Sequence, residues 1–139
     1  MDAIPIQVTE LLNYSYSIAK ALHKAQNEFH PFGVSMDYKG EISQRLVQDN
    51  DDFPSGDALI NSIQTDFNAK LASRTISAYS IIYDATVRNP TYPEGIDVVV
   101  AKVKAIYGDS TELYYLPYKN INGNLQYLEP WGEIVVNKN

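Results

Sequence analysis

The 139 residues, 45% of them hydrophobic and 20% charged, have the composition of a globular protein and the length of a single domain spanning 1–139. The chain contains no cysteine, which excludes disulfide frameworks, thiolate metal sites and cysteine nucleophiles. The net charge of −6, with scattered basic residues and no long apolar run, argues against binding to nucleic acid or to a membrane and predicts a soluble, cytoplasmic protein.

The first 47 residues predict a helix followed by a β-hairpin. Apolar residues recur at steps of three and four over Gln7–Glu28, as on one face of a helix, and Pro31 excludes helical geometry from the residue before it. Two strands, Phe32–Met36 and Glu41–Val47, then flank the turn Asp37–Gly40, in which Asp and Gly favour a tight reversal of the chain.

A second helix is predicted over Gly56–Ala72, after a polar loop at 48–52. Ser55 is a candidate N-cap, and Asp57 lies in the first turn, where a negative charge suits the helix dipole. One apolar stripe runs along this helix and consists of Leu59, Ile60, Ile63, Phe67 and Leu71.

From Thr75 onward the pattern changes to alternation with many β-branched residues, which is typical of strands. Asn122-Gly123 is a dipeptide favoured in type I′ hairpins. The predicted strands are Tyr79–Val87, Ile96–Tyr107, Thr111–Tyr118 and Leu125–Leu128, with a further segment, Ile134–Val136, beyond Pro130. The order αββαββββ predicts an α+β fold with a single antiparallel sheet of five to six strands and two helices on one face.

Tyrosine is the one unusual entry in the composition, with 11 copies against 4 Phe and 1 Trp. Seven of these tyrosines fall on predicted strands after Thr75. Tyrosine suits a half-buried sheet face and is also enriched in protein interfaces. The sheet face without helices is therefore either a recognition surface or dimer interface, or a face that packs on itself with no partner. The candidate binding residues there are Tyr79, Tyr83, Tyr114, Tyr118 and Trp131.

His30 and Phe32 are further candidates, at the junction of the first helix and the first strand. His30 is either a general base or pocket residue, with Asp37 or Glu41 as its acidic partner, or a histidine that caps the helix or bonds a loop carbonyl. His23 lies two helical turns away, about 10 Å, which is too far for a shared metal ion.

Acidic residues gather before and at the start of the second helix: Asp49, Asp51, Asp52 and Asp57. They do not match a calcium loop, because Phe53 and Pro54 stand where that loop needs a ligand and a glycine. We therefore expect a solvated loop here, no metal site and no cofactor.

The stretch Phe29-His30-Pro31-Phe32-Gly33, the turn Asp37–Gly40 after it, and Leu116-Pro117-Tyr118 resemble segments of a family of small bacterial proteins of unknown activity. Those proteins carry a Phe-aromatic-Pro-Phe-Gly motif after a first helix and a Leu-Pro-Tyr segment in the penultimate strand. His30 stands where an aromatic residue is more usual. The resemblance implies a bacterial origin and a fold, and it implies no activity.

The chain has no Gly-x-Ser-x-Gly elbow, no Gly-rich phosphate loop and no dinucleotide fingerprint. The favoured hypothesis is a non-enzymatic protein-interaction or binding domain that uses the tyrosine-rich sheet face, with a protein partner or a second copy as its ligand. An immunity-type protein, an acidic chain that neutralises a basic partner, is one version of it. The alternative is an enzyme or a small-ligand-binding domain with a pocket near His30.

Overall fold

The computed structural model describes residues 6–26, 29–45, 56–105 and 110–136. In chain order the elements are α1 (Ile6–Gln26), β1 (Phe32–Met36), β2 (Ile42–Arg45), α2 (Gly56–Ala72), β3 (Ala78–Val87), β4 (Ile96–Ala105), β5 (Ser110–Ile121), β6 (Asn124–Tyr127) and β7 (Trp131–Val136). The α+β class and the single antiparallel sheet are confirmed. The strand count of five to six is too low, because the segment after Pro130 forms a full strand, which makes seven.

Several predictions fall outside the described residues. They concern the end of the first helix at 27–28, the end of the second strand at 46–47, the acidic loop at 48–52, the N-cap Ser55 and the end of the fourth strand at 106–107.

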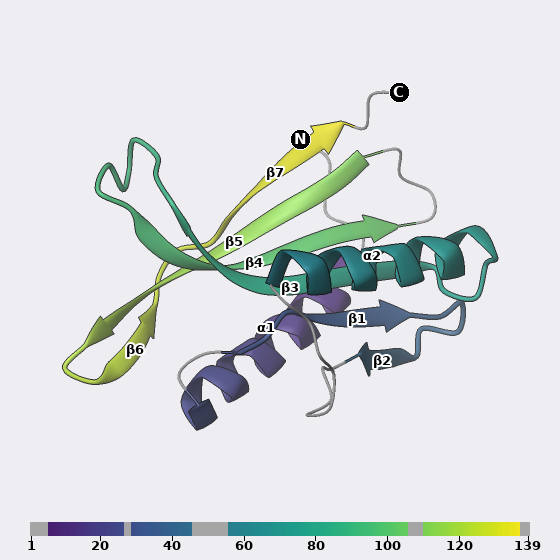
Figure 1. Ribbon diagram of the computed structural model, residues 1–139, viewed down its shortest axis with the longest axis horizontal. Helices are drawn as coiled ribbons and strands as arrows, with labels where there is room; N and C mark the ends of the chain where they lie inside the picture. Colours follow the sequence, from purple (N-terminus) through teal and green to yellow (C-terminus); the bar gives the residue numbers. More distant parts are fainter. Residues whose placement is uncertain (1–5, 27–28, 46–55, 106–109, 137–139) are drawn as a thin grey trace.

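The sheet has the strand order β2-β1-β3-β4-β5-β6, and β7 also pairs with β5 (Figure 1). β3 and β4 form its centre and pair along their whole length, from Ala78 opposite Ala105 to Val87 opposite Ile96. β5 is long enough to carry two strands on its outer side. β7 takes the first half of β5 and β6 takes its last four residues.

The two helices lie on opposite faces of the sheet, which corrects the prediction that both pack on one face. Neighbouring residues of a strand point to opposite faces. Ile82 of β3 packs in one apolar cluster with Leu11 of α1, whereas the adjacent Ile81 packs in another with Phe67 of α2. Both isoleucines are fully buried, so each face of β3 needs its own cover.

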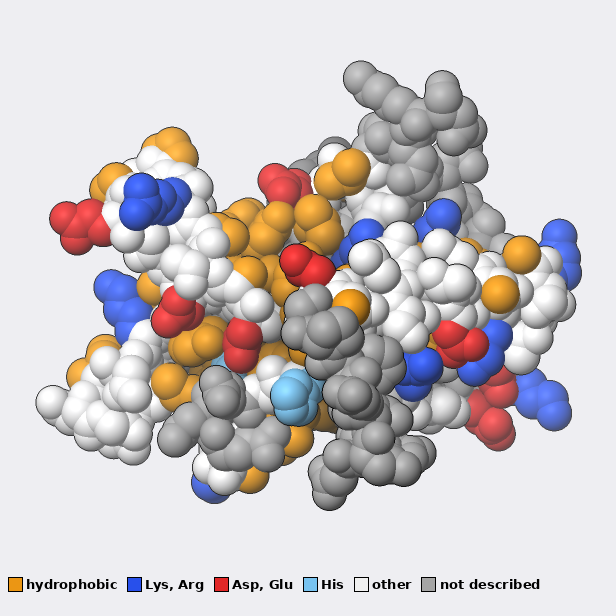
Figure 2. Space-filling view, in the orientation of Figure 1, with side chains coloured by type: hydrophobic (Ala, Val, Ile, Leu, Met, Phe, Trp, Pro, Cys, Tyr) orange, Lys and Arg blue, Asp and Glu red, His pale blue; other side chains and the backbone are white. Residues whose placement is uncertain are grey.

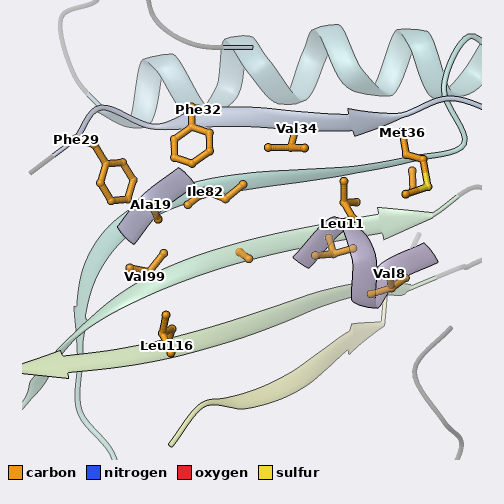
Figure 3. Packing of buried hydrophobic residues seen from close by; sticks show 13 residues of the cluster. Val8, Leu11, Ala19, Phe29, Phe32, Val34, Met36, Ile82, Val99 and Leu116 are labelled. Carbon is orange, nitrogen blue, oxygen red and sulfur yellow. The ribbon is translucent and has the colours of Figure 1, made fainter. Parts of the chain in front are cut away.

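α1 closes one face of the sheet, which we call the α1 face. Figure 3 shows Ala19 of this helix beside Ile82 and Val99 of the central strands, and Leu11 farther along the helix toward Val8. Leu11 and Ala19 belong to a row of fully buried residues at four-residue spacing, of which Ser15 is another member. Because Ser15 and Ala19 are small, the helix can lie close to the sheet. No helix of the described ranges has the length and apolar character needed to cross a membrane.

α2 covers only part of the other face, which we call the α2 face. Leu59, Ile63 and Phe67 of this helix pack on Tyr79 and Ile81 of β3. The helix packs mainly on β1 and β3 and reaches β4 through a hydrogen bond of 2.6 Å from Lys102 to Gln64. The aromatic side chains over β5 and β7 lie beyond it on the same face.

Gly33 of β1 is the point of closest approach beneath α2. A Cβ atom at this position would lie 2.5 Å from Cε2 of Phe67 and 2.9 Å from Cγ2 of Ile63. The glycine that ends the Phe29-His30-Pro31-Phe32-Gly33 stretch thus leaves room for the side chains of α2.

We predict that Gly33→Ala destabilises the protein by about 1–3 kcal/mol, because the added methyl group overpacks the contact between β1 and α2. The control is Gly56→Ala, where the added Cβ would have ordinary contact with Pro31 at 3.8 Å. Urea unfolding measures both. Equal stability of the two variants would contradict the packing of α2 against β1.

Candidate functional site

The α2 face of β4, β5 and β7 carries four half-buried aromatic side chains, Tyr83, Tyr92, Tyr115 and Trp131, and we call it the aromatic face. Its floor is Ile96, Val98 and Val100, all buried. Packed on this floor are the partly buried Tyr83, Ala85, Val87, Tyr92, Leu113, Tyr115, Leu128 and Trp131. Figure 2 shows this apolar surface between α2 and the loop that joins β3 to β4, with acidic side chains along its margin.

Three rings of the aromatic face form a stack. Trp131 lies between Tyr115, at 5.0 Å between ring centroids and 21° between ring planes, and Tyr92, at 6.3 Å and 25°. Tyr115 and Trp131 are cross-strand neighbours on β5 and β7, and the Tyr115 hydroxyl donates a hydrogen bond of 2.6 Å to Glu133 Oε1. Offset stacking of this kind stabilises the rings beyond the area that they bury.

The third ring comes from the loop between β3 and β4, which holds its shape through its own hydrogen bonds. The Asn89 side chain accepts a bond of 2.8 Å from the Tyr92 amide, and the Tyr92 carbonyl accepts one of 3.0 Å from the Gly95 amide. Gly95 has a φ of 101°, which suits glycine. Tyr92 is therefore held in place against Trp131 by the backbone of its loop.

Two carboxylates affect the tyrosines of this face. Burial raises the pKa of Tyr83, and the negative charge of Asp57 at the start of α2 adds to that effect. Burial and the hydrogen bond to Glu133 together raise the pKa of Tyr115. Both phenols are therefore neutral hydrogen-bond donors at physiological pH.

A second candidate, on the α1 face, is a buried polar cluster around His23. The His23 side chain is fully buried. Its Nδ1 lies 2.8 Å from the Tyr127 hydroxyl, and its Nε2 lies 3.2 Å from both carboxylate oxygens of Asp84. The Tyr118 hydroxyl donates a bond of 2.9 Å to Asp84 Oδ1, and the Tyr118 ring packs on the imidazole at 4.7 Å.

His23 has a hydrogen-bond partner at each ring nitrogen. A carboxylate oxygen accepts hydrogen bonds, so Nε2–H is the donor toward Asp84. Burial raises the pKa of Tyr127, and the charge of Asp84 adds to it, so the Tyr127 hydroxyl beside Nδ1 keeps its proton. Both ring nitrogens of His23 are thus engaged.

Beside this cluster lies a cleft of about 460 Å³ between the end of α1 and the β5–β6 hairpin. His23 and Tyr127 line it together with Lys20, Lys24, Gly123, Asn124 and Leu125. The Lys20 ammonium lies 5.0 Å above the centre of the Tyr127 ring, a cation–π contact that covers one side of that ring.

His23 is not among the site residues predicted from the sequence, although its spacing along α1 carries one signal. His23 continues the buried row Leu11, Ser15 and Ala19 at the same four-residue spacing, which places it against the sheet. A buried histidine requires hydrogen-bond partners. Asp84, its partner, lies 61 residues along the chain, and only the strand register brings the two together.

The seven predicted site residues do not form one surface. Tyr83 and Trp131 lie on the aromatic face. Tyr114 and Tyr118 lie one and three residues from Tyr115 on β5, so they point to the opposite face, the α1 face. There Tyr118 joins the His23 cluster. Strand alternation thus divides the predicted tyrosine surface between the two faces.

The remaining three lie elsewhere. Tyr79 and Phe32 are each only 1% exposed and belong to the cores under α2 and α1. His30 is exposed. Asp37, expected as an acidic partner for it, accepts the amides of Lys39 and Glu41 at 2.8 and 2.9 Å instead and so closes its own turn.

No family model matches the chain, and searches of curated proteins and of solved structures return no significant match. Within 6–26, 29–45, 56–105 and 110–136, no three His, Asp or Glu side chains come together in a way that could hold a metal ion.

We predict that Asp84→Ala lowers the free energy of unfolding by about 1–3 kcal/mol, because the buried His23 Nε2 and the Tyr118 hydroxyl lose their acceptor. The matched control is Asp66→Ala on α2, a carboxylate that forms surface ion pairs of 3.3 Å with Arg45 and Lys70. That control should cost about 0–1 kcal/mol. Urea unfolding of the two variants checks this, and an Asp84 variant no less stable than the control would contradict the network.

Proposed function

We propose that this protein is a non-enzymatic binding module whose aromatic face recognises a partner protein. The observation that supports this most is the aromatic face itself: within the described residues, α2 packs on β1 and β3, bonds β4 through Gln64 and Lys102, and leaves the rings over β5 and β7 only partly buried. Contiguous apolar surface of this kind marks interaction sites in soluble proteins. The stacked Tyr92, Trp131 and Tyr115 are the residue types that carry most of the binding energy in protein interfaces.

The rigidity of the stack favours recognition over adaptation. Tyr92 is held by the hydrogen bonds of its loop, and Trp131 and Tyr115 are held by their strands. Aromatic anchors fixed before binding lose little conformational entropy when a partner arrives. A partner would therefore meet a surface already in its bound form.

Charge indicates which partners fit. The chain has a net charge of −6, and Asp57 and Glu133 both act on tyrosines of the aromatic face. An acidic margin around an apolar surface favours a partner that presents Lys or Arg around an apolar anchor. In this proposal the protein is a bacterial, cytoplasmic one, and an immunity-type role, in which an acidic chain neutralises a basic protein, is its most specific form.

The alternative of an enzyme receives less support from the histidines. His30 is exposed, and both ring nitrogens of His23 are already engaged, with Tyr127 and with Asp84. A general base needs a free nitrogen within reach of the substrate proton. The His23 cluster thus fits a structural role that joins α1 to the sheet.

We predict that Trp131→Ala and Tyr92→Ala each weaken partner binding about 30-fold, the effect of removing an interface hot spot of about 2 kcal/mol. The control is Tyr38→Ala, which alters a tyrosine that is 51% exposed in the β1–β2 turn, away from this face. Tyr92 is a loop residue, so its variant spares the sheet.

The wild type and the three variants are each immobilised on a column, and the proteins that each column retains from an extract are compared. The affinity for a retained protein is then measured by titration. We expect the wild type and the Tyr38 variant to bind the partner, and this binding to weaken as salt is added. Retention that is equal on all four columns, or that is lost on the Tyr38 variant alone, would contradict the proposal.

A further inference from the structure

β7 is an edge strand whose outer side is open. It pairs with β5 through six residue pairs, from Ser110 opposite Val136 to Tyr115 opposite Trp131. On its other side it pairs with no strand of the described part of the chain. Alternate residues of an edge strand point their N–H and C=O groups outward, where they can pair with another strand.

The edge strands β2 and β6 are protected and β7 is not. β2 is only four residues long, with polar Ser43 and Gln44 exposed and Arg45 at its end. β6 is equally short and exposes Asn124 and Gln126. Short length and polar or charged side chains are the usual means by which proteins block edge pairing.

β7, by contrast, has the sequence Trp-Gly-Glu-Ile-Val-Val, without Lys, Arg or Pro. Ile134 is 67% exposed and Val135 is 45% exposed, two of the most exposed large apolar side chains in the described structure. Its one charge, Glu133, accepts the Tyr115 hydroxyl within its own sheet. Nothing in the chemistry of this strand opposes the addition of another strand.

We propose that β7 pairs with β7 of a second copy of this chain, antiparallel and about a two-fold axis through Ile134. A two-fold axis normal to the sheet keeps each side chain on its own face. The residue through which the axis passes sets the register: Glu133 lies opposite Glu133 of the second copy if the axis passes through Glu133, and opposite Val135 if it passes through Ile134. Pairing centred on Glu133 places like charges opposite each other, which is unfavourable. Pairing centred on Ile134 places isoleucine opposite isoleucine and Glu133 opposite Val135.

This dimer extends one sheet through both copies. Because the faces are preserved, the two aromatic faces lie on the same side of the joined sheet. The inference does not depend on what the aromatic face binds. It adds that the surface is presented twice, which would raise the avidity for a partner with two sites.

Sedimentation equilibrium of the whole chain, at protein concentrations from about 10 µM to 1 mM, tests the association. A single strand pair is a small interface and binds weakly, so we expect the dimer to form within this concentration range. Ile134→Lys should abolish the dimer. Ile121→Lys, at a side chain 45% exposed beside β6, should leave it intact. Because each copy has a charge of −6, the dimer should strengthen as salt screens the repulsion.

Disulfide trapping tests the register, since the chain has no cysteine of its own. Residues directly opposite in an antiparallel pair have Cα atoms about 4.5–5.5 Å apart, within disulfide reach. Ile134→Cys should therefore cross-link at least ten-fold faster than either Val135→Cys or Ile121→Cys. In the proposed register the two substituted residues of the Val135→Cys dimer would not lie opposite each other, because each faces position 133 of the other copy. A wild type that stays monomeric at 1 mM, a dimer that survives Ile134→Lys, or equal cross-linking of the three variants would overturn the proposal.

Discussion

The whole arrangement depends on strand β3, which is apolar on both of its faces. Ile81 and Ile82 are adjacent and both fully buried, and strand geometry sends them to opposite sides. One helix cannot cover both, so α1 closes one face and α2 the other. In the part of the chain that the structure describes, α2 packs on β3 and β1 and reaches β4 through Gln64 and Lys102, and the aromatic face lies beyond it.

The two faces are completed by different chemistry. On the α1 face, the polar residues where the helix ends satisfy one another, since His23, Asp84, Tyr118 and Tyr127 form a closed set of hydrogen bonds. On the α2 face, the surface beyond the helix is closed only by its own rings, with Trp131 between Tyr92 and Tyr115. The first arrangement needs no partner, whereas the second leaves apolar surface in water, and this contrast favours the aromatic face as the binding surface.

Local features were predictable because they depend on neighbouring residues. α2 has its predicted bounds, and the Asn122-Gly123 turn has the positive φ values, 54° and 86°, that its sequence favours. The distribution of the helices over the faces was not predictable in the same way. Alternation along β3 shows which residues share a face, but a strand buried on both sides gives no preference for one. The contact of His23 with Tyr127 spans 104 residues and depends on strand register, which local sequence patterns do not determine.

The proposed binding role requires that water reaches the rings of the aromatic face. Nuclear magnetic resonance with a soluble paramagnetic agent measures this directly, because the single tryptophan gives one indole resonance. We expect strong relaxation of the Trp131, Tyr92 and Tyr115 ring protons and little effect on Phe67, which is 2% exposed beneath α2. Protection of Trp131 equal to that of Phe67 would show that the face is covered and would rule out its role as a binding surface.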